Sequence, residues 1–195
     1  MNFLISFLKN HNVITEKYEN VYRYAAEILL HKTIVTLMTL AIGFGVGAPV
    51  EAITVYITFR MIRRMAGGYH ADSPQKCMLI SAMLIAGTAL VAKWVKWNAL
   101  ESLLIMGITD IAIILLCPVD CNSKRIDEAD VYLFKKRTAV RVMLLGMTAL
   151  CTSFLEKGNL LRAICCGELL CLFLTILGKW HSAKLRSDII DSSRT

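Results

Sequence analysis

The sequence predicts an all-α fold: a polytopic integral membrane protein with about six transmembrane helices. Of its 195 residues 56% are hydrophobic, and the mean hydropathy is +0.55. A soluble domain usually has about 45–50% apolar residues, so this composition favours a lipid environment. The apolar residues gather in blocks at 33–50, 52–59, 78–92, 102–119, 138–155 and 160–178, with charged residues between them.

The N-terminal segment is predicted to be an amphipathic helix on the membrane surface. An apolar lead, Asn2–Leu8, is followed by Lys9, Lys17 and Arg23, which are expected to face lipid headgroups. The C-terminal tail is polar and is expected to be frayed. The single membrane domain 1–195 therefore has three parts: an N-terminal segment 1–27, a transmembrane bundle 28–178 and a tail 179–195.

The apolar blocks predict crossings at 28–46, 48–62, 77–92, 99–117, 138–155 and 160–178. The first two are separated by a turn that holds Gly43, Gly45, Gly47 and Pro49 and no basic residue, which favours a helical hairpin. Two crossings need about 20 residues each, so the alternative is one tilted helix over 33–59. That alternative has five crossings and moves the loop after it to the opposite side of the membrane.

Basic residues are distributed unevenly between the two sides of this topology. Eighteen of the 22 Lys and Arg residues lie on the side of both termini, and only Lys93, Lys96, Lys157 and Arg162 lie on the other. Because basic loops stay in the cytoplasm, both termini and the loop 60–77 are predicted to be cytoplasmic. The net charge of +7 then reflects topology and contacts with the lipid bilayer, and no nucleic-acid partner is expected.

Two polar features interrupt the apolar pattern further along the chain. Residues 118–137 form the largest internal polar segment, and Asp127–Lys136 within it is predicted to be a short amphipathic surface helix that leads into the fifth crossing. Asp110 and Glu168 fall inside predicted crossings, where ionisable groups are costly. Each therefore lines a substrate cavity, orients His70 or makes a polar contact between helices.

The loop 60–77 holds the residues with the clearest chemistry. Ser73-Pro74 is typical of a helix start, which places Cys77 at the end of the first turn, where the helix dipole favours a thiolate. His70 follows Gly67-Gly68, whose backbone freedom allows the loop to fold back over this turn. A neighbouring imidazole would take the thiol proton. In the alternative reading, His70 is a solvated loop residue and Cys77 a small apolar residue.

The other six cysteines lie in or at the ends of apolar blocks and are expected to be buried free thiols. One Cys pair, Cys117 and Cys121, has a spacing compatible with a metal site, but it lacks nearby His partners. No metal and no cofactor are therefore predicted.

Around His70 and Cys77 the sequence resembles the accessory gene regulator protein B (AgrB) family of Gram-positive bacteria. The resemblance rests on Arg63, Gly67-Gly68, His70-Ala71 and Cys77, and it extends to the segment Pro118-Val-Asp-Cys-Asn-Ser-Lys-Arg125 and most of the chain. Ile126 stands where the family usually has proline, which puts the role of Lys124-Arg125 in doubt.

The resemblance implies a cysteine endopeptidase of the bacterial cell membrane that cleaves a short amphipathic precursor peptide of the AgrD type. Cys77 would form an acyl-enzyme thioester and His70 would act as base and acid, with Arg63, Gly67 and Gly68 in supporting or substrate-binding roles. Attack by a Cys or Ser of the precursor would give a cyclic thiolactone or lactone quorum-sensing signal. A homodimer is compatible with this role. The alternatives are a small transporter or peptide-export component without protease activity, and a purely structural membrane subunit.

Overall fold

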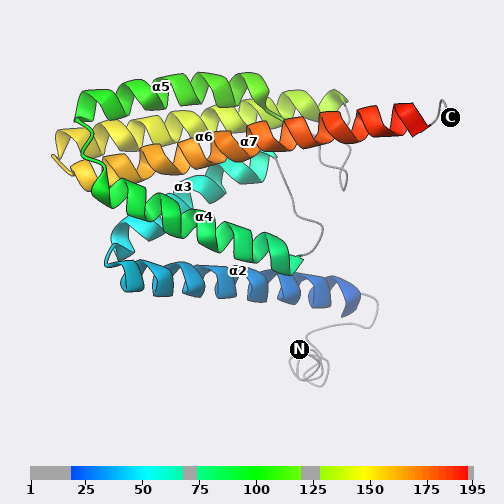
Figure 1. Cartoon of the computed structure of the whole chain (residues 1–195), viewed down its shortest axis with the longest axis horizontal. Helices are drawn as coiled ribbons and strands as arrows, with labels where there is room; N and C mark the ends of the chain where they lie inside the picture. The colour runs from blue at the N-terminus through cyan, green and yellow to red at the C-terminus, as the bar shows by residue number, and fades with distance from the viewer. Residues whose placement is uncertain (1–18, 68–73, 120–127, 193–195) are drawn as a thin grey trace. The chain divides into compact units, whose positions relative to one another are not determined.

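The computed structural model describes residues 19–67, 74–119 and 128–192, and these residues form six α-helices (Figure 1). The helices are α2 (Glu19–Val46), α3 (Pro49–Ala66), α4 (Pro74–Trp94), α5 (Ala99–Leu116), α6 (Glu128–Phe154) and α7 (Gly158–Ser192). The all-α prediction is confirmed. The amphipathic surface helix expected within 1–27 lies largely outside the described residues and stays a prediction.

The chain divides into two packing units, Met1–Met38 and Thr39–Thr195. The described part of the first unit is the helical stretch from Glu19 to Met38, and α2 continues from there into the second unit. All contacts considered below lie within the second unit.

A tight turn joins α2 to α3 at the predicted place. Gly47 has φ +68°, a conformation that suits glycine, and the amide of Ala48 donates to the carbonyl of Gly43 at 2.8 Å. A Cβ on Gly43 would lie 2.9 Å from the Cβ of Ala52, so a small residue is needed there. The alternative of one continuous helix over 33–59 is wrong.

The helix α4 begins at Pro74 as predicted and ends beside the α2–α3 turn. There the Lys93 ammonium donates to the carbonyls of Val46 and Gly47, at 3.2 and 3.0 Å. After a short connection α5 begins, and the Asn98 amide donates to the Glu101 carboxylate at 3.0 Å, which satisfies a backbone group at the helix start.

Several helices extend beyond the predicted crossings. The helix α2 begins at Glu19, ahead of the crossing predicted at 28–46. Residues from Glu128 onward, where a surface helix leading into the fifth crossing was expected, are the first turns of α6. Much of the tail 179–195 is not frayed, because α7 continues to Ser192. The reason for α6 and α7 is local, since no proline or glycine follows Lys136 or Lys179 closely enough to end either helix.

The helix α7 is the centre of the bundle and packs against α3, α4, α5 and α6. Figure 1 shows it beside α5 and α6. Small residues allow the close approach: a Cβ on Gly167 would lie 2.9 Å from the Cβ of Thr58 on α3. The buried side chains of α7 include Leu161, Ala163, Ile164, Cys165, Cys166, Leu170, Cys171 and Leu174.

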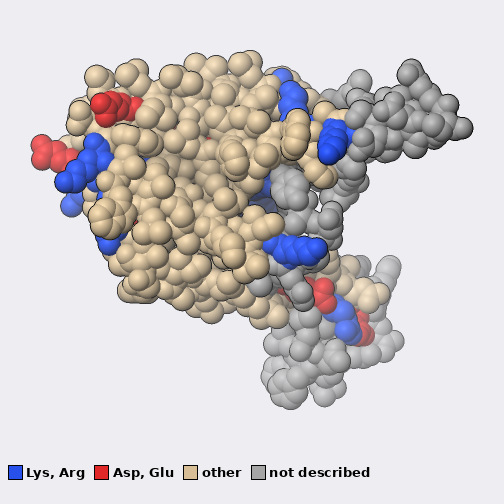
Figure 2. All heavy atoms as spheres, in the orientation of Figure 1, with Lys and Arg blue, Asp and Glu red and all other residues tan. Residues whose placement is uncertain are grey.

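Three of the described helices are long and apolar enough to cross a membrane, over Glu19–Val46, Ala99–Leu116 and Gly158–Lys184, and Leu79–Trp94 is a shorter apolar helix. On the face in Figure 2, charged side chains gather toward the helix ends and leave an uncharged surface between them. Both observations fit a membrane protein. The number of six crossings stays a prediction.

Candidate functional site

The two polar segments singled out in the sequence meet at one end of the bundle. The amide of Val119 donates to the carbonyl of Ala66 at 3.0 Å, and Gly67 and Val119 form an isolated parallel β-bridge. Gly67 leads into the segment 68–73, and Val119 leads into the segment 120–127. The structure thus fixes the start of the candidate catalytic loop to the residues that follow α5.

Gly67 is the glycine that this junction requires. Its backbone has φ +73° and ψ −151°, a region open almost only to glycine. A Cβ built on it would also clash with the carbonyl oxygen of Val119. Two independent constraints therefore exclude a side chain at this position.

Two arginines brace the end of α3 that carries Gly67. The Arg63 guanidinium donates to the carbonyl of Gly67 at 2.8 Å, and the Arg141 guanidinium reaches from α6 to the carbonyl of Met61 at 2.7 Å. The Gly67 carbonyl lies beyond the last helical residue, so Arg63 supplies a donor that the helix does not, and both positive charges are favourable near a helix C-terminus. Arg63 thus holds the loop entrance, and its predicted contact with substrate or headgroups stays a prediction.

Cys117 ties the same junction to α6. Its buried sulfur lies 3.3 Å from the hydroxyl of Thr138 and 3.7 Å from the carbonyl of Met65. Because the sulfur is buried and contacts these two oxygens, Cys117 packs α5 against α3 and α6.

Residue 77 occupies the position predicted for it, at the end of the first turn of α4. His70 and Gly68 lie outside the described residues, so the pairing of His70 with Cys77 stays a prediction. The chain between the fixed Gly67 and the helix start at Pro74 is short, however, and residue 70 lies midway along it.

The remaining described cysteines are free thiols, as expected. Burial is confirmed for Cys165, Cys166 and Cys171 on α7 but is wrong for Cys151, which is exposed on α6. Cys121 lies outside the described residues. Among residues 19–67, 74–119 and 128–192, no group of three or more His, Cys, Asp or Glu side chains could hold a metal ion.

The carboxyl groups of Asp110 on α5 and Glu168 on α7 are neighbours. Glu168 is fully buried, and neither of its oxygens has a partner among the donor groups of the described residues. Two adjacent carboxylates cannot both be ionised at low cost in such surroundings, so a shared proton is needed. This placement is compatible with a polar contact between helices, and the other two roles that the sequence left open stay predictions.

The comparisons with known proteins identify the family of this chain. The family model of Accessory gene regulator B matches residues 1–176. The chain belongs to this family. Membership links it to accessory gene regulator quorum sensing, in which AgrB is a peptidase-like component.

Curated relatives of the AgrB family point the same way. One from Listeria monocytogenes serotype 4b (strain CLIP80459) is 25% identical over 140 residues, which cover 71% of this chain and 69% of the relative. Another, from Listeria monocytogenes serovar 1/2a (strain ATCC BAA-679 / EGD-e), is 24% identical with the same coverage. Both are named only as AgrB-like. No solved structure matches the chain.

The sequence reasoning missed the partners that anchor the loop in this AgrB-family chain: Val119, Thr138 and Arg141. Arg141 was counted only as a topology residue, although a basic side chain inside an apolar block is a signal for a specific buried acceptor. Val119 acts through its backbone, so its side chain gave no signal at all.

Proposed function

We propose that the chain is a membrane-embedded cysteine endopeptidase that cleaves an AgrD-type precursor peptide, with Cys77 as nucleophile. The observation that carries the proposal is the position of residue 77 in the first turn of α4, beside a loop whose start is fixed at Gly67. Unpaired amides and the helix dipole at this end favour a thiolate.

His70 serves as the base and acid of this reaction. The imidazole takes the Cys77 proton, and the sulfur attacks the peptide carbonyl to form a tetrahedral adduct. The carbon–nitrogen bond then breaks, the amine leaves with the proton from the imidazolium, and the acyl group remains as a thioester. Attack on the thioester by a Cys or Ser of the same peptide releases Cys77 and closes a thiolactone or lactone ring.

The basic side chains near this end, among them Arg60, Arg64 and Lys76, are exposed and suit acidic groups of a peptide or lipid headgroups. The bilayer and the precursor are therefore the proposed partners, and the loop end is the proposed cytoplasmic side. The transporter alternative predicts discontinuous helices, whereas each of the helices that the structure describes is continuous.

Co-expression with an AgrD-type precursor tests the proposal, with cleavage followed by gel mobility. Cys77→Ala and His70→Ala are expected to abolish cleavage, and Cys77→Ser to leave almost none, because a hydroxyl has no comparable anion near neutral pH. Cys151→Ala, at an exposed cysteine on α6, and Cys121→Ala are the matched controls and should cleave normally. Full cleavage by Cys77→Ala, or an equally large loss of cleavage in either control, would contradict the assignment of Cys77 as the nucleophile.

A further inference from the structure

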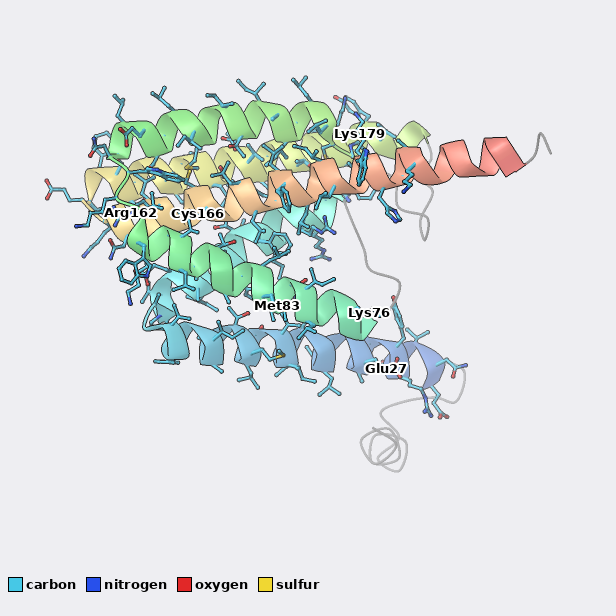
Figure 3. All side chains as sticks on the ribbon, in the orientation of Figure 1. Glu27, Lys76, Met83, Arg162, Cys166 and Lys179 are labelled. Atoms are coloured by element: carbon cyan, nitrogen blue, oxygen red, sulfur yellow. The ribbon has the colours of Figure 1, made fainter. Side chains whose placement is uncertain are left out.

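An apolar groove runs along α4 on the side that faces α7. Its volume is about 320 Å³, at the lower end of the range of roughly 300–1,000 Å³ typical of ligand pockets. Cys166 and Leu170 of α7 form its buried floor, and Met83 of α4 and Phe173 of α7 are exposed at its rim. Figure 3 labels Met83 and Cys166 on these two helices.

The side chains that line the groove are almost all apolar. The one hydroxyl in its lining, that of Thr88, donates to the carbonyl of Leu84 at 2.6 Å within the same helix. The other lining side chains are largely apolar, and they include Trp97 of the α4–α5 connection. The occupant must therefore be apolar where it contacts α4.

The register of α4 aligns this groove with the candidate nucleophile. Leu84 and Val91 line the groove and follow residue 77 by two and four helical turns, which places all three on one face to within about 40°. Along the axis, Leu84 lies about 10 Å and Val91 about 21 Å from residue 77, at a rise of 1.5 Å per residue. A single helical face thus carries first the nucleophile and then the apolar groove.

We infer that this groove binds the apolar segment of the precursor peptide next to the bond that is cleaved, an inference that rests on the proposed function. An extended chain advances about 3.3 Å per residue, so a peptide attached at residue 77 reaches Leu84 in about three residues and Val91 in about six. Apolar side chains at these distances from the scissile bond fill the groove. A lipid acyl chain is the other apolar ligand of this surface, but nothing aligns it with residue 77.

Gly87 allows a direct test because it lines the groove and a Cβ there would meet nothing within 4 Å. Gly107 on α5 is a matched control, exposed and equally open, but not among the groove-lining residues. The probe is a fluorescein-labelled synthetic AgrD-type peptide, short, amphipathic and with an internal cysteine. Its binding to the full-length Cys77→Ala variant in nanodiscs is measured by fluorescence anisotropy.

Adding Gly87→Trp to this variant should weaken peptide binding by about tenfold or more, which corresponds to about 1.4 kcal/mol, and Gly87→Leu should weaken it less. With Gly107→Trp added instead, peptide binding should stay within about twofold of that of the Cys77→Ala protein, since substitutions at sites remote from each other act independently. Replacing the peptide's apolar residues near the scissile bond by serine should weaken its binding to the protein that retains Gly87. The same replacement should weaken binding little further when the protein carries Gly87→Trp. Thermal melting checks that each variant is folded.

The inference is overturned if Gly87→Trp and Gly107→Trp bind the peptide equally, or if the peptide fails to bind the Cys77→Ala protein. It is also overturned if Gly87→Trp removes a bound lipid in native mass spectrometry while peptide binding is unchanged. Cleavage by the unaltered enzyme is scored separately. Groove-dependent binding without Cys77-dependent cleavage would refute the proposed function and leave the groove as a peptide site.

Discussion

Replacing Gly67 tests whether the geometry of the loop entrance matters for cleavage, apart from any loss of stability. Gly67→Ala is expected to reduce precursor cleavage by about 100-fold, the cost of a misplaced catalytic group. The new Cβ meets the Val119 carbonyl at a backbone conformation that alanine avoids. The measurement is the single-turnover cleavage rate in membranes, with insertion checked by protease protection.

Gly107→Ala is the control for this prediction, because its Cβ would enter open space on α5. Normal cleavage in Gly67→Ala would mean that the bridge to Val119 is irrelevant to the site. The related expectation for Gly68, that Gly68→Ala also reduces cleavage strongly, stays a prediction at a position outside the described residues.

Arg141 carries a second prediction at this scale. Arg141→Gln should lower the unfolding free energy by about 1.5–3 kcal/mol, the range for hydrogen bonds to charged groups, since the guanidinium bond to the Met61 carbonyl is weakened. Arg141→Lys should restore part of the loss, because the charge at the α3 C-terminus returns. Chemical unfolding in detergent micelles measures both; equal stability of all three proteins would contradict the bracing role.

Much of the candidate site could be predicted from residue types, and some of it could not. Proline after serine located the α4 start, and a glycine pair located the loop entrance. Which of the two glycines is anchored, and by what, depended on the backbone of Val119, which is 52 residues away in sequence. Sequence patterns report side chains, so a contact made by main-chain atoms alone remained invisible.

At the scale of elements, α5 and α7 are joined by the Asp110–Glu168 pair, and this contact predicts an asymmetric mutational response. Glu168→Gln should be nearly neutral, because an amide donates to the Asp110 carboxylate without a shared proton. Asp110→Leu should cost about 1–3 kcal/mol, the usual result of leaving a buried polar group without a partner. Thermal unfolding in detergent is the measurement.

The double variant, Asp110→Leu with Glu168→Met, is the control for this prediction. Apolar replacement of both members of a buried polar pair is often nearly neutral, so stability should largely return. A double variant as unstable as the sum of its single changes would show that the carboxyl pair does more than join α5 to α7.

Hydropathy placed every described helix in order, but it misjudged where α2 and α6 begin and where α7 ends. The hairpin turn at Gly47 was predicted correctly because glycine and proline interrupt helices for local reasons. The N-terminal part of α6 and the C-terminal part of α7 were predicted to lie outside the transmembrane helices, because polar residues were taken to end a helix. A helix that leaves the apolar layer continues until its backbone meets a breaker.

For the whole molecule, the central prediction is the sidedness of the membrane. Single-cysteine variants treated with an impermeant thiol reagent in intact cells should be labelled at Gly45→Cys and Asn98→Cys but not at Ser73→Cys or Ser192→Cys. The reason is the excess of basic residues at the loop end. Labelling of Ser73→Cys and Ser192→Cys alone would invert the topology; permeabilised cells provide the control that every site can react.

On the proposed function, the anchoring of Gly67 also determines when an active enzyme can first exist during synthesis. The α3 and α4 segments, with residue 77, are synthesised before Val119 and Arg141, and these later residues hold the α3 end. A nascent chain that stops short of α6 therefore has a nucleophile on a helix start but no fixed loop entrance. Peptides that the growing chain meets during insertion are expected to stay uncut, and activity begins only when α6 has joined the bundle.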